Sequence, residues 1–223
     1  MKIGVIVAME SEYRQMLQLL GDQPEGMVGN NNIVLHKCGI GKVNAAVGTT
    51  QFLVEHHPDC VVSTGVAGGI DHKLQVMDVV AASETVYHDV WCGEGNDYGQ
   101  VQGLPARYQA HTTLLHTAQR VKVSGVRIVE GLTCTGDQFI TDRPALDAIK
   151  QRFPEGLAVD MESAAIAQTC YLHQIPFLSM RILSDTPGNT PDHMAQYQNF
   201  WATLGDTAFQ VIMTFLKLLP STL

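Results

Sequence analysis

The feature of this sequence that most constrains its fold is the alternation of short, continuously apolar runs with longer segments of helical period. The apolar runs are rich in Val and Ile, as expected of strands that are buried on both faces. Two parallel strands must be joined by a crossover, which is usually a helix. The alternation therefore predicts an α/β fold with a mixed, mostly parallel central sheet flanked by helices.

The individual elements follow from the same pattern. Strands are predicted over 2–8, 33–38, 60–64, 76–82, 126–130, 157–159 and 177–183. Helices are predicted over 10–20, 42–56, 162–173 and 194–219, the last with a weak point at Gly205. The length of 223 residues predicts one domain over 1–223, because single cores stop growing only at roughly 250–300 residues.

Two glycine-rich turns, at 39–42 and 65–69, are predicted to follow strands. Neither has the spacing of a dinucleotide-binding or phosphate-binding loop. Two interpretations therefore stay open for each turn: tight packing of a strand against a helix, or close approach of the backbone to a ligand. The segment 87–107 has no clear period, and loops of this length are usually functional or mobile.

Composition excludes several classes of partner. The chain has 14 Lys and Arg against 22 Asp and Glu, a formal charge of −8, so we expect no nucleic-acid partner, because each phosphate contact needs a cation. No apolar run approaches the roughly 20 residues that cross a bilayer, and we expect no membrane association. Five scattered cysteines without a Cys-x-x-Cys pair predict neither disulfides nor a metal site. We expect a soluble, cytoplasmic protein.

Acidic side chains follow three of the predicted strands. Glu10 and Glu12 come after the first strand, Asp160 and Glu162 follow another, and Asp185 closes a third. Each acid alone suits the start of a helix. Because ligands of open α/β sheets bind beyond the carboxyl ends of the strands, we expect these carboxylates to meet at one edge. Such a cluster suits a reaction that develops positive charge and needs both a proton donor and a proton acceptor.

A set of segments in a fixed order resembles the 5′-methylthioadenosine/S-adenosylhomocysteine nucleosidases of the purine nucleoside phosphorylase superfamily. The segments are IVAMESE, CGIGKVNAA, STGVAGGI, YHD with YGQ, GLTCTGDQFI, AVDMESAAIAQTC and RILSD, and they span nearly the whole chain. The resemblance implies hydrolysis of the N-glycosidic bond of 5′-methylthioadenosine and S-adenosylhomocysteine, releasing adenine and the 5-thioribose product. It implies no cofactor, and a place in nucleoside catabolism and methionine salvage.

The resemblance also implies a role for individual residues. Glu12 matches the general base that polarises the attacking water, and Asp185 matches the acid that delivers a proton to adenine N7. Glu162 matches the ligand of the ribose hydroxyls, and Phe139 matches the aromatic side chain that packs on the purine. The other matched positions line the pocket or lie near the water and the acid: Met9, Ile40, Val66, Ile140, Asp160, Met161, Arg181, Ser184 and Tyr197.

The chain departs from the family pattern in the pocket and in one loop. Val66 stands where many members have Ser or Thr, and Asp160 and Tyr197 stand where Glu and Phe are usual. The loop over 91–103 is one residue longer than usual. In the family this loop crosses to the neighbouring subunit, so the resemblance implies a homodimer whose pocket is completed from a second copy by Trp91, Tyr98 and Pro105. These departures leave the preferred 5′ substituent open.

Three alternatives remain beside a nucleosidase of this kind. A phosphorylase would have to hold phosphate near Glu10 and Glu12, and a carboxylate about 4 Å from a phosphate charge costs about 4 kcal/mol at an effective dielectric of roughly 20. Water is therefore the favoured nucleophile. A nucleosidase for futalosine-type compounds is a second alternative. A non-enzymatic nucleoside-binding relative is the third, and it predicts the loss of Glu12 or Asp185, which are both present.

Overall fold

The computed structural model describes residues 1–186, 193–203 and 208–223. Its strands are β1 (Lys2–Val7), β2 (Glu25–Val28), β3 (Asn31–Lys37), β4 (Cys60–Gly69), β5 (Val79–Tyr87), β6 (Tyr108–Gln109), β7 (Ile128–Thr135), β8 (Gly156–Asp160) and β9 (Phe177–Asp185). Its helices are α1 (Glu10–Leu19), α2 (Lys42–His56), α3 (Thr112–Arg120), α4 (Arg143–Arg152), α5 (Ser163–Leu172), α6 (His193–Thr203) and α8 (Gln210–Leu218). None of these helices is both long and apolar enough to span a membrane.

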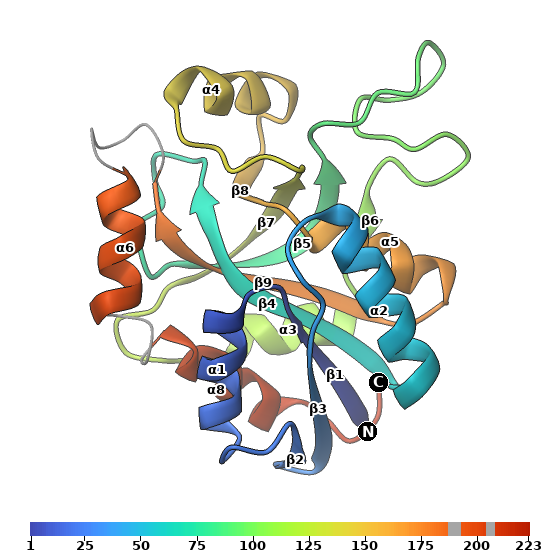
Figure 1. The fold of residues 1–223 in the computed structure, drawn as a ribbon, viewed down its shortest axis with the longest axis vertical. Coiled ribbons are helices and arrows are strands. Elements are labelled where there is room, and N and C mark those ends of the chain that lie inside the picture. The colour runs from blue at the N-terminus through green and yellow to red at the C-terminus, as the bar shows by residue number, and fades with distance from the viewer. Residues whose placement is uncertain (187–192, 204–207) are drawn as a thin grey trace.

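Five of the strands close into a ring of hydrogen-bonded neighbours. β4 pairs with β8, β8 with β7, β7 with β5, β5 with β9, and β9 pairs back to β4. The strands β1, β3 and β2 extend the sheet outward from β4, and β6 adds to β5 (Figure 1). Parallel and antiparallel pairings are mixed, with the parallel ones in the majority, which confirms the predicted class of sheet.

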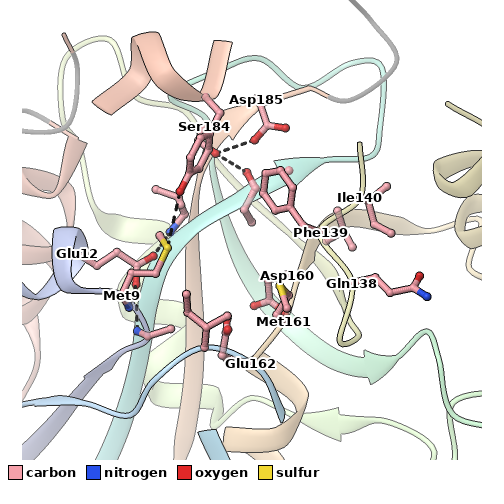
Figure 2. Close-up of a pocket in the computed structure, with 17 residues that line it drawn as sticks. Met9, Glu12, Gln138, Phe139, Ile140, Asp160, Met161, Glu162, Ser184 and Asp185 are labelled. Atoms are coloured by element: carbon pink, nitrogen blue, oxygen red, sulfur yellow. Dashed lines mark hydrogen bonds between the residues drawn. The ribbon is translucent and has the colours of Figure 1, made fainter. Parts of the chain in front are cut away.

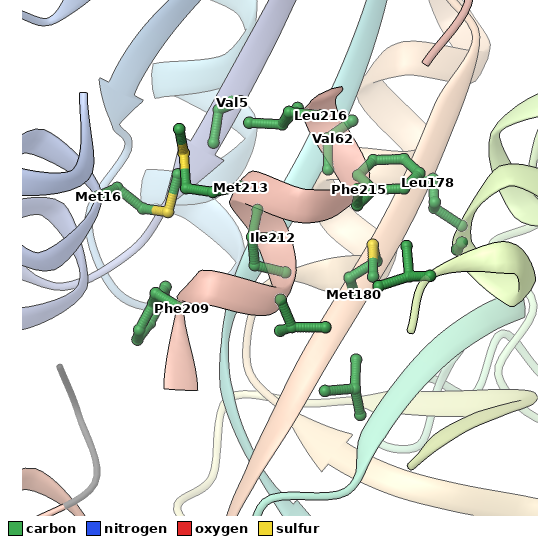
Figure 3. Packing of buried hydrophobic residues seen from close by; sticks show 14 of the residues in the cluster. Val5, Met16, Val62, Leu178, Met180, Phe209, Ile212, Met213, Phe215 and Leu216 are labelled. Carbon is green, nitrogen blue, oxygen red and sulfur yellow. The ribbon is translucent and has the colours of Figure 1, made fainter. Parts of the chain in front are cut away.

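Helices cover both faces of the sheet because successive strand residues point to opposite sides. Val5 and Val62 face a cluster that contains Met16 of α1 and Phe215 of α8 (Figure 3). Their neighbours in the strands, Ile6 and Val61, face the other side and pack with α2 and α5, through Phe52 and Ile166. Each fully buried side chain of this size contributes about 1.5–3 kcal/mol to folding.

The sequence predicted β1, α1, β3, α2, β8 and α5 within a few residues of their observed bounds. It missed β2, β6, α3 and α4. The predicted strand over 76–82 is observed later in the chain, as β5, and the strand over 126–130 continues further, as β7. The single helix predicted over 194–219 is wrong, because α6 and α8 are separate helices. Gly205, the predicted weak point, lies outside the described residues.

The predicted glycine turn at 65–69 is also wrong, because these residues continue β4 to Gly69. The end of β4 pairs with β9 on one edge and with β8 on the other. Gly65 has a φ of +149°, and a Cβ there would lie 2.3 Å from Oε1 of Glu12. The glycine is therefore needed for a close approach inside a strand, as in the second of the two interpretations, although the approaching group is a carboxylate of the chain itself.

Candidate active site

A cavity of about 390 Å³ lies where the carboxyl ends of β1, β4, β8 and β9 come together (Figure 2). This volume suits a small organic ligand. Twelve of the residues singled out from the sequence line it: Met9, Glu12, Ile40, Val66, Phe139, Ile140, Asp160, Met161, Glu162, Ser184, Asp185 and Tyr197. Sequence reasoning missed Ala8, Ala67, Gly68, Gln138 and Val159, although Gln138 stands directly before Phe139 in a quoted segment.

Glu12 is held at the cavity wall by backbone N–H groups. It is the third residue of α1, so its side chain can reach back over the helix start, as the acid of a capping box does. Its Oε2 accepts hydrogen bonds from the backbone of Ala8 (3.0 Å) and Met9 (2.9 Å), and its Oε1 accepts one from Val66 (2.9 Å). Burial raises the pKa of Glu12, while the charge of Arg181 and the three N–H donors act in the opposite direction.

Arg181 lies in the interior and is not among the residues that line the cavity. Its Nε donates to Oδ2 of Asp160 (2.6 Å) and its Nη2 donates to Oγ of Ser63 (2.9 Å). Asp160 also accepts hydrogen bonds from the hydroxyl groups of Thr135 (2.6 Å) and Ser163. The oxygens of Asp160 are thus engaged by internal partners, and the residue holds the Arg181 charge near the carboxylates of the site.

Glu162 follows β8 and is also buried. Its Oε1 accepts a hydrogen bond from the backbone N–H of Gly41 (2.8 Å), which belongs to the loop before α2. Burial and the charge of Asp160 raise the pKa of Glu162 to about 7, against the opposing effects of Arg181 and the Gly41 N–H.

Asp185 is the last residue of β9, and only 3% of its surface is exposed. The Ser184 hydroxyl donates a hydrogen bond to Oδ1 of Asp185 (2.7 Å). Figure 2 shows Glu12, Glu162 and Asp185 at separate points around the cavity. Together with Asp160, whose oxygens are engaged by internal partners, they make four carboxyl groups in one cavity. Such a set can bind hydroxyl groups, stabilise positive charge and exchange protons at different places on one ligand.

Part of the cavity lining is aromatic or apolar. The rings of Phe139 and Tyr197 meet edge to face, with centroids 5.7 Å apart. The Tyr197 hydroxyl donates to Sδ of Met9 at 3.7 Å. Phe139 and Ile40 are about half exposed at the mouth of the cavity. Aromatic and thioether groups in this arrangement suit a planar ring and an apolar substituent.

The loop between β5 and β6 projects from the body of the protein (Figure 1). Trp91 and Tyr98 stack on each other with ring centroids 6.0 Å apart, and the guanidinium of Arg152 lies 4.4 Å from the Tyr98 centroid. Trp91 is 56% exposed. Trp91, Tyr98 and Pro105 do not line the cavity of their own chain.

In the described part of the chain, no group of three or more His, Cys, Asp or Glu side chains has the geometry to hold a metal ion. All five cysteines are free thiols. The residues that line the cavity offer carboxyl groups, hydroxyl groups and backbone amides.

Comparison with known proteins gives the family. The profile of the Phosphorylase superfamily matches residues 2–217. A 5′-methylthioadenosine/S-adenosylhomocysteine nucleosidase from Chromohalobacter salexigens is 42% identical over 86% of this chain and 87% of its own length. A nucleosidase of the same name from a Geobacillus species is 36% identical over 97% of this chain and 98% of its own length. The chain belongs to this nucleosidase family.

Solved structures agree with the assignment to the nucleosidase family. The nucleosidase of this name from Colwellia psychrerythraea, solved in complex with adenine, has a TM-score of 0.91 and 32% identity, covering 100% of this chain and 97% of that one. The enzyme from Neisseria meningitidis, in complex with methylthio-immucillin-A, has a TM-score of 0.87 and 34% identity, covering 97% and 98% of the two chains. These matches confirm the nucleoside phosphorylase-like fold that the resemblance implied.

Proposed function

We propose that this protein hydrolyses the N-glycosidic bond of 5′-methylthioadenosine and S-adenosylhomocysteine, releasing adenine and the 5-thioribose product. The observation that carries the proposal is that Glu12 and Asp185 line one cavity in different surroundings. Glu12 accepts hydrogen bonds from three backbone N–H groups, whereas Asp185 accepts a hydrogen bond from a side-chain hydroxyl, that of Ser184. Two carboxyl groups with opposite proton roles require such different environments.

Glu12 is the general base of this reaction. As the bond from adenine to C1′ lengthens, positive charge develops on the ribose, and the negative charge of Glu12 stabilises it. A water molecule then adds to C1′ and gives its proton to Glu12. A carboxylate whose pKa is raised by burial is a better proton acceptor near neutral pH than an exposed one.

Asp185 is the general acid. Adenine is a poor leaving group as an anion, so Asp185 delivers a proton to N7 and adenine departs neutral. The Ser184 hydroxyl, 2.7 Å from Oδ1, keeps the Asp185 side chain in place. Glu162 holds the ribose hydroxyls, and Phe139 packs on the purine.

Hydrolysis is favoured over phosphorolysis by the charge of the cavity. Its described lining residues include the acids Glu12, Glu162 and Asp185 but no Lys or Arg that could neutralise a phosphate. Val66 lines the wall beside Glu12 with an apolar side chain. Water, which carries no charge, is the nucleophile that this site accepts at least cost.

The protein functions as a cytoplasmic homodimer. Two neighbouring helices support this part of the proposal with apolar side chains on their outer surfaces, namely Val43, Val47 and Val54 of α2 and Tyr171 and Leu172 of α5, all more than half exposed. Such a face is costly on a monomer and typical of an interface. Two-fold pairing would bring each 91–105 loop to the other subunit. Five free thiols are consistent with a reducing cytoplasm.

The test is release of the free base from a panel of 5′-substituted adenosines and from futalosine, each with and without phosphate; the base is adenine for the adenosines and hypoxanthine for futalosine. We expect adenine and a free thioribose, at a rate that phosphate does not change. Recovery of a ribose 1-phosphate would show a phosphorylase, and turnover of futalosine alone would show the related nucleosidase. The Glu12→Gln variant measures the background rate.

A further inference from the structure

Three charged side chains outside the cavity link separate parts of the chain. Nζ of Lys42 donates to both carboxylate oxygens of Asp89, each at 2.8 Å. Asp89 Oδ2 accepts the backbone N–H of Asp137 (2.9 Å), and Asp137 Oδ1 accepts the backbone N–H of Lys42 (2.7 Å). These contacts form a closed cycle, which we call the Lys42–Asp89–Asp137 cluster.

The two loops that the cluster joins both supply residues to the lining of the cavity and touch each other through Lys42 and Asp137. The loop at 39–42 places Ile40 in the wall and directs the Gly41 N–H at Oε1 of Glu162. The loop at 136–140 supplies Gln138, Phe139 and Ile140. None of the three cluster residues lines the cavity itself.

The packing around the cluster leaves little room for either loop to shift. A Cβ at Gly41 would lie 3.0 Å from Oδ1 of Asp137. A Cβ at Gly136 would lie 2.4 Å from the imidazole of His88 and 3.0 Å from Cγ of Asp89. The side chains of Lys42 and Asp89 are only 23% and 21% exposed, so solvent screens their attraction less than at a free surface.

We propose that Lys42, Asp89 and Asp137 are positioning residues that fix the distance between the Ile40 wall and the Phe139 wall of the cavity, and so set the affinity for the nucleoside. This inference rests on the proposed function, because the nucleoside is the ligand that the two walls would enclose. The cluster acts on binding through the loops and makes no contact with the reacting atoms.

Removing the ammonium group tests the cluster. In Lys42→Met, the Asp89 and Asp137 carboxylates would face each other without a cation, and the two loops would separate. We expect KM for 5′-methylthioadenosine to rise about tenfold while kcat changes less than about threefold. The variant would weaken binding of the substrate and of the transition state equally, and such a loss raises KM without lowering kcat. Lys42→Arg keeps the charge, and we expect it to restore most of the affinity.

The pH profile gives a second readout. Glu162 is faced by Asp160, Arg181, Glu12 and the Cys38 thiol, and by the Gly41 N–H from the loop. Loosening the loop weakens the Gly41 hydrogen bond, which normally lowers the pKa of Glu162. We therefore expect the acidic limb of kcat/KM to move to higher pH in Lys42→Met. A loss of stability alone would not move this limb.

The matched control is Lys150→Met. Lys150 donates to Asp71 at 2.9 Å, and the two side chains are 27% and 18% exposed, close to the values at the cluster, but neither residue lines the cavity. We expect KM and the pH profile to remain those of the wild type. Equal changes in both variants, or no change in Lys42→Met, would overturn the proposal.

Hydrogen–deuterium exchange separates this inference from the proposed function. We expect faster exchange in peptides covering 38–42 and 136–141 of Lys42→Met, and no such change in Lys150→Met. If the wild-type protein released no adenine from any nucleoside, the proposed function would fail while exchange still reported on the cluster. Unchanged exchange in Lys42→Met would show that the cluster does not hold the loops, whatever the activity.

Discussion

The backbone N–H of Val66 donates to Oε1 of Glu12 at 2.9 Å, although 54 positions separate the two residues in the chain. The other carboxylate oxygen accepts from Ala8 and Met9, at the end of β1. The position of Glu12 is therefore set by the backbone just after β1 and by the backbone within the neighbouring strand β4. Because strand backbone is rigid, the carboxylate is held in place before a ligand arrives.

Glu12→Gln is expected to lower kcat about 10²–10⁴-fold, as loss of a general base does. The amide also places an NH₂ donor against backbone donors, which should lower the free energy of unfolding by about 1–3 kcal/mol. Adenine release and thermal denaturation measure the two effects. Glu10→Gln is the control, because Glu10 is exposed and pairs with Arg14 and Lys37, and wild-type activity is expected there.

Asp185→Asn is expected to lower turnover of 5′-methylthioadenosine about 10²–10⁴-fold. The deficit should shrink for a nucleoside whose base carries an electron-withdrawing group, because a better leaving group needs less protonation. The ratio of the two rates, measured for wild type and variant, tests this expectation. An equal deficit for both substrates would contradict the role of Asp185 as the acid.

Gly65→Ala is expected to remove activity to about the same extent as loss of Glu12. The new Cβ would lie 2.3 Å from Oε1 of Glu12, and a φ of +149° is unfavourable for alanine. Gly26→Ala is the control, since a Cβ there meets no atom within 4 Å. Steady-state rates and melting temperatures of both variants test this expectation. A fully active Gly65→Ala enzyme would show that the Glu12 carboxylate can move without loss of activity.

The pH dependence of the free energy of unfolding should reveal the raised pKa of Glu162. Its pKa is raised from 4.5 to about 7 on folding, so between these values the folded state holds a proton that the unfolded state has released. The free energy of unfolding attributable to Glu162 therefore falls as pH rises through this window. Glu162→Gln removes this dependence, and its stability relative to wild type should increase by roughly 2 kcal/mol from pH 5 to pH 8. Urea denaturation at both pH values is the measurement; a pH-independent difference would be inconsistent with the raised pKa.

Val47→Glu is expected to yield a monomer in light scattering, because it places a charge on the outer apolar surface of α2. Met27→Glu introduces the same charge at another exposed apolar side chain, on β2, and should leave the dimer intact. In the dimer, Trp91→Ala should weaken inhibition by a 5′-alkylthio analogue more than inhibition by adenine. A monomeric wild type with full activity would exclude a pocket shared between subunits.

Elements and site residues could be predicted from the sequence where the signal lies in a short stretch of chain. Strand ends could be located from apolar runs, so Glu12, Glu162 and Asp185 could be placed near one edge of the sheet from the sequence alone. The helix α4 was missed despite a local signal: the Asp142 side chain accepts the N–H of Ala145, and Pro144 stands in the first turn. An N-cap Asp followed by Pro is typical of a helix start.

Long-range pairing could not be predicted in the same way. The apolar runs of β5 and β9 are mostly buried on both faces, so they carry no alternation that would fix direction or register. Their antiparallel pairing, and the pairing of β8 with β4, are therefore properties of the three-dimensional fold that no local pattern predicts. The ion pair of Lys42 and Asp89 could not be predicted either, because it joins two loops that are distant in the sequence and no local pattern indicates it.

The closed ring of strands determines when Glu12 and Asp185 can come to line the same cavity. Glu12 emerges early during synthesis on the ribosome, and Asp185 emerges late, at the end of β9. This strand lies between β4 and β5 and must form hydrogen bonds along both edges as it enters. Both pairings join β9 to strands that are far away in the sequence, so they can form only after β9 itself has been synthesised. Most of the chain is therefore synthesised before Glu12 and Asp185 can share one cavity, and Tyr197, which also lines that cavity, follows later still.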